Sequence, residues 1–232
     1  MARRAPEDRF QDLIDAATGV FIAQGYRRTQ MADVAEAMGV AKGTIYLYVE
    51  SKEALFELVI RAASVEERLP LPAELPVVTP RAGTALATVQ SVLTSAGGGM
   101  PALVAALGRR RVSDVRVEIE VIVRELYTTL SRRRVGIKLV DRCAHDHPEL
   151  AAAWYTGGRE AALALLIEYL EARRRTGRLR TFPDTAVAAR IMLETVVFWA
   201  VHRHWDPAPQ PMDERAAEDT VVAFVLGAAL KE

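Results

Sequence analysis

Apolar residues recur at helical spacing through most of this 232-residue chain, and this pattern restricts the fold most strongly. Near the N-terminus they line one side of a predicted helix, at Phe10, Leu13, Ile14, Ala17 and Phe21. Strand-like alternation occurs in VRVEIEVIV, residues 115–123, which is isolated between helical patterns and has no obvious partner, so we predict helix there as well. Because half of the residues are apolar, a substantial core can be buried. The predicted fold class is all-α.

Proline and glycine divide the chain into parts. The segment LPLPAELPVVTPRAG, residues 69–83, interrupts the helical pattern, and AGGGMP at residues 96–101 interrupts it again. Longer helices are predicted downstream, over residues 117–145, 148–176, 185–205 and 213–231. The sequence therefore predicts a small domain at residues 1–68 and a larger helical domain at residues 69–232.

Composition limits the classes of function. Lysine plus arginine equals aspartate plus glutamate, 30 each, so net charge argues neither for nor against a nucleic-acid partner. Cys143 is the single cysteine, which excludes an internal disulfide and fits a reducing compartment. No secretion signal or membrane-length apolar run is found, so a cytoplasmic location is expected. Catalytic motifs, phosphate loops and zinc-ligand spacings are also missing, so we expect neither an enzyme nor a cofactor.

Two short helical segments on either side of Gly39 form a helix-turn-helix pattern. Thr29 is expected to cap a helix over residues 30–38, which Gly39 ends. A second helix is predicted over residues 41–48. Ser51 is the expected N-cap of the next helix.

The second short helix has an outward face without long charged side chains. A projection at 100° per residue with Ile45 toward the core turns Tyr48 inward. The outward face is then made of Gly43, Thr44, Tyr46 and Leu47. A glycine here costs roughly 1 kcal/mol of helix stability but lets the backbone approach a partner closely. Hydroxyl groups can bond phosphates, and methyl groups can contact thymine. The face therefore predicts nucleic-acid binding, unless Gly43 is merely a poor helix residue and the tyrosines pack on the first helix.

Residues 25–56, GYRRTQMADVAEAMGVAKGTIYLYVESKEALF, resemble the DNA-binding segment of TetR-type (TetR/AcrR) transcriptional regulators. The match to the family pattern comprises Gly25, Tyr26, Thr29, Val34, Ala35, Gly39, Val40, Lys42, Gly43, Thr44, Ile45, Tyr46, Ser51, Lys52, Glu53 and Leu55. Two positions depart from it: Val49 replaces the usual Phe, and Leu47 replaces a frequent polar or aromatic residue. The second departure leaves the operator preference open.

The resemblance implies a role for each matching residue. Thr29, Tyr46, Tyr48 and Lys52 would hold phosphates, while Lys42, Gly43 and Thr44 would lie nearest the base edges. Other candidate DNA contacts are Arg27, Arg28 and Leu47, together with Arg3, Arg4 and Arg9 on the N-terminal arm. The expected partner is a palindromic operator in double-stranded DNA, bound by a homodimer that forms through the last two helices. Two recognition helices would then read half-sites one helical turn apart.

The family also implies a repressor that a small, largely apolar effector releases. Aromatic or polar residues on otherwise apolar helices are the candidate pocket residues: Tyr127, Cys143, Trp154, Tyr155, Arg159, Phe198, Trp199 and His202. The alternative is a DNA-binding dimer whose C-terminal domain is a scaffold or docks a protein. The His-x-His pairs at residues 145–147 and 202–204 lack cysteine or glutamate in ligand spacing, so no metal site is expected.

Overall fold

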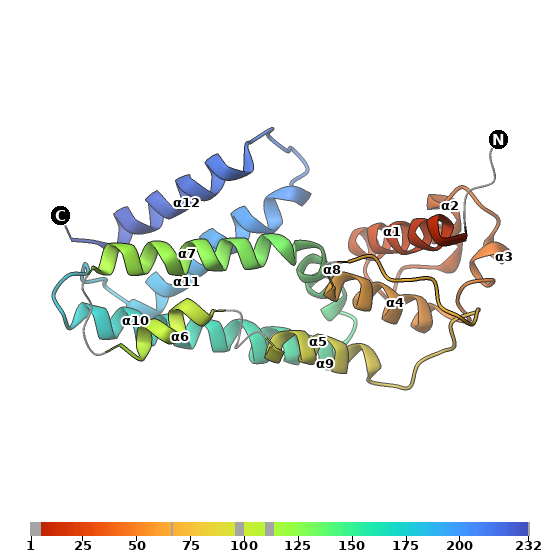
Figure 1. The fold of residues 1–232 in the computed structure, drawn as a ribbon, viewed down its shortest axis with the longest axis horizontal. Coiled ribbons are helices and arrows are strands. Elements are labelled where there is room, and N and C mark those ends of the chain that lie inside the picture. The colour runs from red at the N-terminus through yellow and green to blue at the C-terminus, as the bar shows by residue number, and fades with distance from the viewer. Residues whose placement is uncertain (1–5, 66, 96–99, 110–113, 232) are drawn as a thin grey trace. The chain divides into compact units, whose positions relative to one another are not determined.

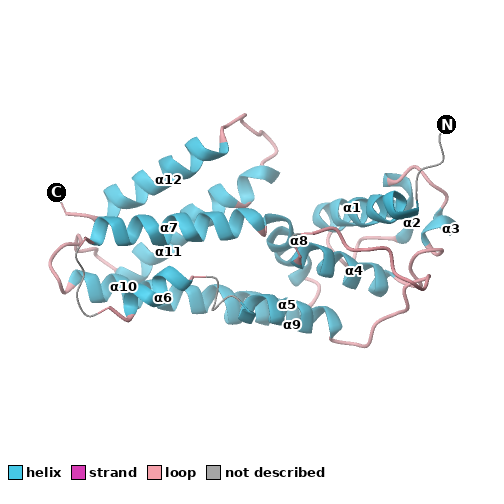
Figure 2. Ribbon diagram, in the orientation of Figure 1, coloured by secondary structure: helices cyan, strands magenta, loops and turns pink. Residues whose placement is uncertain are grey.

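The computed structural model describes residues 6–65, 67–95, 100–109 and 114–231, and within these ranges the chain is helical without a β-strand (Figures 1 and 2). The predicted all-α class is confirmed. The alternating stretch at residues 115–123 lies in helix α7 (Val115–Arg132), as predicted. Extended pairing in the described chain is limited to isolated bridges, between Val49 and Val77 and between Leu179 and Leu230.

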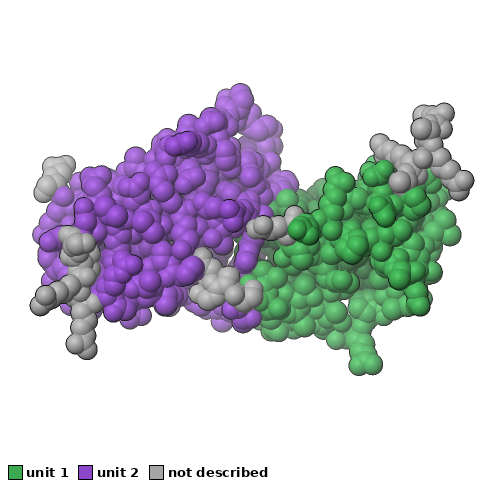
Figure 3. Space-filling view, in the orientation of Figure 1, with its two compact units in different colours: residues 1–92, 135–154 green, residues 93–134, 155–232 purple. Residues whose placement is uncertain are grey.

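The chain packs as two compact units, which Figure 3 shows in different colours. The first unit contains residues 1–92 and 135–154, and the second contains residues 93–134 and 155–232. The first unit therefore includes a segment from far along the chain. The functional division at residues 68 and 69 stays a prediction, because packing groups residues by contact rather than by role.

The helix-turn-helix region begins the first unit. Helix α1 (Pro6–Gln24) ends at Gly25, whose positive φ of 82° is typical of a glycine after a helix. Helix α2 (Met31–Ala37) ends before Gly39, which also has positive φ, as predicted. The prediction that Thr29 caps α2 is wrong: Gln30 holds the cap position, and its backbone N–H donates to Asp33 Oδ2 at 2.8 Å.

Helix α3 (Lys42–Ile45) is shorter than the predicted residues 41–48. The chain turns after Ile45 and then pairs with the proline-rich segment. Val77 N–H donates to the Tyr48 carbonyl at 2.8 Å, and Glu50 N–H donates to the Val77 carbonyl at 3.0 Å. The helix therefore does not continue past a turn at residues 46–48, and Val49 forms an isolated bridge with Val77.

Helices α1, α2, α3 and α4 (Lys52–Ser64) share one core, in which α1 packs on α4 and α2, and α2 packs on α3. Ser51 caps α4 as predicted, because its Oγ accepts from Ala54 N–H at 3.1 Å. Ile45 and Val49 are fully buried. Val49, where the family usually has Phe, is therefore a core residue.

The first unit is completed by most of α5 (Thr84–Ser95), by α8 (Arg134–Ala144) from residue 135 onward, and by α9 (Pro148–Ala151). The single helix predicted over residues 117–145 is wrong, because the chain breaks at Arg133, between α7 and α8. Gly136 permits close packing, since a Cβ at this position would come within 2.9 Å of the Ala63 carbonyl oxygen.

The second unit contains α6 (Pro101–Leu107), α7, α10 (Ala161–Arg174), α11 (Thr185–Ala200) and α12 (Glu214–Ala229). Helix α11 packs against α7, α10 and α12, so it is central to this unit (Figure 1). The segment predicted as one helix over residues 148–176 is divided into α9, a π-helical stretch (Ala152–Glu160) and α10. A 3₁₀ turn (His202–Trp205) follows α11.

Local capping explains where the last two helices begin. Asp184 accepts from the N–H groups of Ala186 and Val187, and Asp213 accepts from Ala216 N–H. Among the described helices, none combines the length and the apolar character that crossing a bilayer requires.

Candidate nucleic-acid interface

The outward face of α3, continued by the turn that holds Tyr46 and Leu47, is exposed as the projection predicted. Leu47 is 66% exposed and Tyr46 is 42% exposed, while Ile45 is fully buried. A Cβ built at Gly43 would have no heavy atom within 4 Å, so the surface at this glycine is open. Thr44 is half-buried beside it. Small and apolar groups thus occupy a surface position on a one-turn helix.

Tyr48 is half-buried and its ring lies 6.5 Å from the ring of Phe10. Its placement against α1 agrees with the inward direction predicted from the helical projection. Tyr46 is the more accessible of the two tyrosines.

Lys52 braces the loop that precedes α2. Its Nζ donates to the carbonyl oxygens of Tyr26 at 3.1 Å and Thr29 at 3.1 Å, and lies 3.5 Å from that of Arg27. The same ammonium lies 4.5 Å from the centre of the Tyr26 ring. The Lys52 ammonium thus already forms hydrogen bonds with backbone carbonyl groups of the protein. These bonds support a role in positioning the loop more directly than a contact with phosphate.

Thr29 closes the same loop. Its Oγ1 donates to the Gly25 carbonyl at 2.7 Å, and the residue is 1% exposed. A buried hydroxyl that already has an acceptor is not available to phosphate, so the structure does not support the expected phosphate contact by the Thr29 side chain.

Tyr26 links the loop to α4. Its hydroxyl donates to Glu53 Oε1 at 3.0 Å, and burial, followed by the hydrogen bond to Glu53, raises the pKa of Tyr26 far above its ordinary value. The pKa of Glu53 is lowered, first by a hydrogen bond from its own backbone N–H and further by the Tyr26 hydroxyl. Tyr26 therefore stays a neutral donor and Glu53 a charged acceptor at neutral pH.

Several cationic side chains of the helix-turn-helix region reach the surface. Arg9, Arg27, Arg28 and Lys42 are exposed. The predicted contacts Arg3 and Arg4 lie outside the described residues. The site combines a close-approach surface at Gly43 with guanidinium and ammonium groups that can contact phosphates, which is what a nucleic-acid contact needs.

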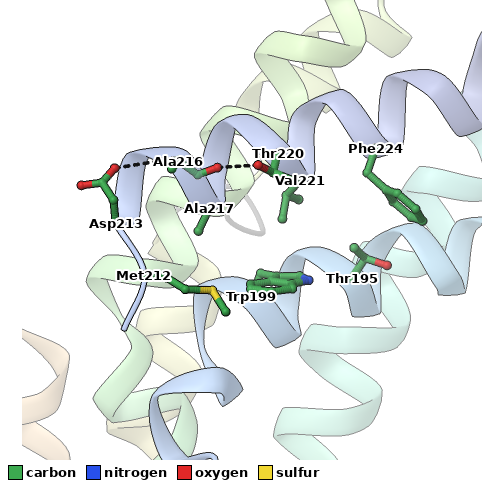
Figure 4. A pocket seen from close by; sticks show the side chains of 9 residues that line it. All are labelled: Thr195, Trp199, Met212, Asp213, Ala216, Ala217, Thr220, Val221 and Phe224. Carbon is green, nitrogen blue, oxygen red and sulfur yellow. Dashed lines mark hydrogen bonds between the residues drawn. The ribbon is translucent and has the colours of Figure 1, made fainter. Parts of the chain in front are cut away.

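The second unit contains a cleft between α11 and α12 with a volume of about 640 Å³ (Figure 4). Its lining is mostly apolar and comes from Thr195, Trp199, Met212, Asp213, Ala216, Ala217, Thr220, Val221 and Phe224. The Trp199 indole faces small side chains of α12 such as Ala217 (Figure 4). This volume falls in the range of small-molecule pockets, roughly 300–1,000 Å³.

Of the predicted effector residues, Trp199 lines one of the two described cavities and the other seven line neither, so the predicted set stays a prediction. Trp199 lines the cleft, and Phe198 packs edge-on against it at 5.8 Å between ring centres. The Tyr127 hydroxyl lies 3.5 Å from the Trp199 carbonyl oxygen, and Arg159 forms an ion pair with Glu194. The other four predicted residues line neither described cavity.

Those four residues lie on other elements. Trp154 and Tyr155 are on the π-helical stretch, and His202 is in the 3₁₀ turn. Cys143 lies in the first unit, where it is fully buried with its Sγ 4.0 Å from the Phe21 carbonyl oxygen. Burial raises the pKa of Cys143 to about 12, so its thiol stays protonated at neutral pH.

A smaller apolar cavity of about 30 Å³ lies among α6, α7, α10, α11 and α12, and sequence reasoning missed it. A buried ion pair lies beside it: Arg173 Nε donates to Glu118 Oε2 at 2.6 Å, and the hydroxyl of Tyr169, which lines the cavity, donates to the same oxygen at 2.9 Å. Glu118 and Arg173 are separated by 55 residues, so no local spacing signals this pair. Among the residues that the structure describes, no three His, Cys, Asp or Glu side chains gather as metal ligands would.

Comparisons with known proteins agree with this geometry. Residues 13–59 match the model of the family described as "Bacterial regulatory proteins, tetR family". Residues 121–228 match the model described as "AefR-like transcriptional repressor, C-terminal domain".

Curated relatives match in the first of these segments. The fatty acid metabolism regulator protein of Bacillus subtilis is 44% identical over 45 residues, 19% of this chain and 23% of the relative. The transcriptional repressor KstR2 of Rhodococcus jostii is 34% identical over 53 residues, 23% of this chain and 26% of the relative. The chain thus matches about a quarter of the length of these relatives.

Solved structures share the fold along the chain. The ketosteroid transcriptional regulator KstR2 of Mycobacterium tuberculosis aligns with a TM-score of 0.58 and 15% identity, covering 100% of this chain and 99% of the other. The SmeT–triclosan complex aligns with a TM-score of 0.53 and 19% identity, covering 97% and 93% of the two chains. With both family models matched and the helix-turn-helix geometry present, the chain belongs to the TetR family of helix-turn-helix transcriptional regulators.

Proposed function

We propose that this protein is a homodimeric, ligand-responsive repressor that binds a palindromic DNA operator. The observation that carries the proposal is the exposed face of α3, where Gly43, Tyr46 and Leu47 offer a close-approach surface. A one-turn helix reads few bases by itself, so two copies on half-sites one helical turn apart supply the specificity.

Exposed apolar side chains on the last two helices support dimerisation. On α11 these are Val187, Ile191 and Phe198, with exposed fractions of 55%, 57% and 43%, and on α12 Phe224 is 61% exposed. Exposed apolar patches are typical of interfaces between subunits, and these four side chains are candidates for such a patch. Phe224→Asp is expected to convert the dimer to a monomer in light scattering, whereas Val104→Asp on α6, 48% exposed in the wild type, is the matched control.

The cleft between α11 and α12 supports a small, largely apolar effector. It has the volume of a ligand site and an aromatic wall, Trp199, opposite Ala217. The name of one structural relative records a complex with triclosan, and other relatives are named for fatty acids and ketosteroids. Binding of DNA and effector would be coupled reciprocally.

A thermal-shift titration with triclosan and long-chain fatty acids tests the effector. A compound that binds the folded state raises the melting temperature. Thr220→Trp narrows the cleft and should remove the shift, while Ala223→Trp on the same helix, outside the lining, should keep it. If every compound fails in the wild-type protein, the alternative of a scaffold or protein-docking domain is favoured.

DNA binding is tested by selection from sheared genomic DNA of the source organism at moderate salt. We expect enrichment of an inverted repeat whose half-sites are centred about one helical turn apart, and loss of enrichment with Tyr46→Ala. A folded dimer that enriches no sequence would contradict the proposed function.

A further inference from the structure

The loop at residues 25–29, which leads into α2, is held from two sides. On one side Lys52 of α4 donates to its carbonyl groups. On the other side lie Arg142 at the end of α8 and the turn at residues 145–147 that follows this helix, all in the same compact unit. More than a hundred residues of sequence separate this turn from the loop.

Asp146 bonds the loop backbone directly. Arg27 N–H donates to Asp146 Oδ2 at 2.8 Å, across 119 positions of sequence. Arg142 donates from its guanidinium to the Ala23 carbonyl at 3.2 Å, at the end of α1. A carboxylate acceptor makes the first of these bonds stronger than one between neutral groups.

Aromatic packing fixes the same turn on α4. The His147 ring stacks on Phe56 at 5.5 Å between ring centres and meets the Tyr26 ring edge-on at 4.3 Å. Tyr26 also lies under the Lys52 ammonium. The turn and α4 therefore hold the loop through the same tyrosine.

Glycine at position 25 suits both the positive φ of this residue and its close contact with the turn. A Cβ at this position would lie 3.1 Å from Asp146 Oδ2 and 3.7 Å from the Arg142 carbonyl oxygen. The absence of a side chain at residue 25 thus allows the carboxylate to reach the loop backbone.

We infer that Asp146 is a positioning residue for DNA binding: through Arg27 N–H it fixes the loop that sets where α2 begins, and with it the register of the helix-turn-helix. The inference rests on the proposed function in that DNA is the ligand whose affinity the loop controls. The DNA-facing residues are on α3 and its flanks, so Asp146 acts through the loop rather than by touching DNA.

Charge and position predict opposite effects when this carboxylate is removed. Removing a negative charge strengthens binding to a polyanion by Coulomb attraction alone. Losing the bond to Arg27 N–H loosens the loop and weakens binding. Asp146→Ala is therefore expected to bind the selected operator about tenfold more weakly, the loss typical of one hydrogen bond to a charged acceptor. Asp146→Asn retains an acceptor oxygen and should bind within about twofold of the wild type.

The experiment has two readouts on the full-length protein. Hydrogen exchange at the amides of residues 26–30 is measured first, in the absence of DNA, and Asp146→Ala should exchange faster there than the wild type. Operator affinity by anisotropy is measured second. Glu149→Gln is the charge control: the Glu149 carboxylate lies 3.7 Å from His147 Nδ1, and no bond to the loop is seen. It should leave exchange at residues 26–30 unchanged and bind the operator at least as tightly as the wild type, because it removes a negative charge.

The outcomes separate this inference from the proposed function. Unchanged exchange at residues 26–30 in Asp146→Ala overturns the inference whatever the DNA result. Equal or tighter operator binding by Asp146→Ala also overturns it. Leu193→Ala in the core of α11 provides a destabilised comparison, and it should lower the melting temperature without changing exchange in the loop. A wild type that binds no operator refutes the proposed function, and the exchange measurement then still decides whether Asp146 fixes the loop.

Discussion

Gly43→Ala should make the protein more stable and a poorer DNA binder. Gly43 lies at the second position of α3 and has an ordinary negative φ, so alanine fits its backbone. A Cβ built there has no heavy atom within 4 Å, so the folded protein accommodates the methyl group without a clash. Replacing a helical glycine by alanine stabilises by roughly 0.5–1 kcal/mol. For a chain of this length that is a rise of about 1–4 °C in melting temperature.

The same methyl group should interfere with the DNA contact. If Gly43 lies against the duplex, the added carbon enters a packed interface, and overpacking of this kind costs typically 1–3 kcal/mol. The expected loss of operator affinity is therefore about 5- to 150-fold. The assay pairs a thermal melt with an anisotropy titration of the selected operator at constant salt.

Gly19→Ala is the matched control. Gly19 is an exposed glycine within α1, and a Cβ there also has no heavy atom within 4 Å. The control should gain similar stability and leave operator affinity unchanged. Gly43→Ala that binds the operator as tightly as the wild type would refute the argument that this glycine serves docking.

Three further substitutions test other parts of the structure. Lys52→Ala removes the donor to the loop carbonyls, so it should lower stability by about 1–2 kcal/mol and weaken operator binding, and a thermal melt with a titration measures both. Burial raises the pKa of Glu57. The protonated Glu57 side chain therefore stabilises the fold below its unfolded pKa of about 4.3, and this contribution is lost as the pH rises through the folded pKa. Glu57→Gln should therefore melt at a higher temperature than the wild type at pH 7 and lose that advantage near pH 4, and equal melting temperatures at pH 7 would contradict this reading. Glu118→Ala leaves Arg173 buried without its carboxylate and should cost about 3–5 kcal/mol in urea unfolding followed by tryptophan fluorescence, whereas Glu118→Leu with Arg173→Met should cost much less.

The predictions that the structure confirmed rest on neighbours along the chain. Helical spacing identified α7 in spite of its alternating start. The glycines after α1 and α2 and the cap at Ser51 follow from backbone geometry within one turn. The exposed face of α3 and of the turn after it follows from a projection around Ile45. Each of these features depends on residues that are only a few positions apart, so it can be predicted from the sequence.

The corrections have the opposite origin. Thr29 was expected to cap α2, but its hydroxyl donates to the Gly25 carbonyl oxygen instead. Helix α3 is shorter than predicted, and the segment after it forms backbone hydrogen bonds with Val77. The effector pocket stays a prediction: its candidate residues lie on several elements, and a projection shows which face a side chain occupies but not which helix lies opposite.

The sequence by itself determined the helical class, the helix-turn-helix and the outward face of its second helix, because each depends on side chains within a turn or two of one another. The tertiary structure alone decided that Lys52 and Asp146 brace one loop and that Glu118 and Arg173 are buried as a pair. Arg27 and Asp146 are 119 residues apart, and only the packing of α8 within the first unit brings a carboxylate to that backbone N–H. A hydrogen bond between distant positions produces no periodic pattern in the sequence from which it could be predicted, because helix packing decides which residues meet.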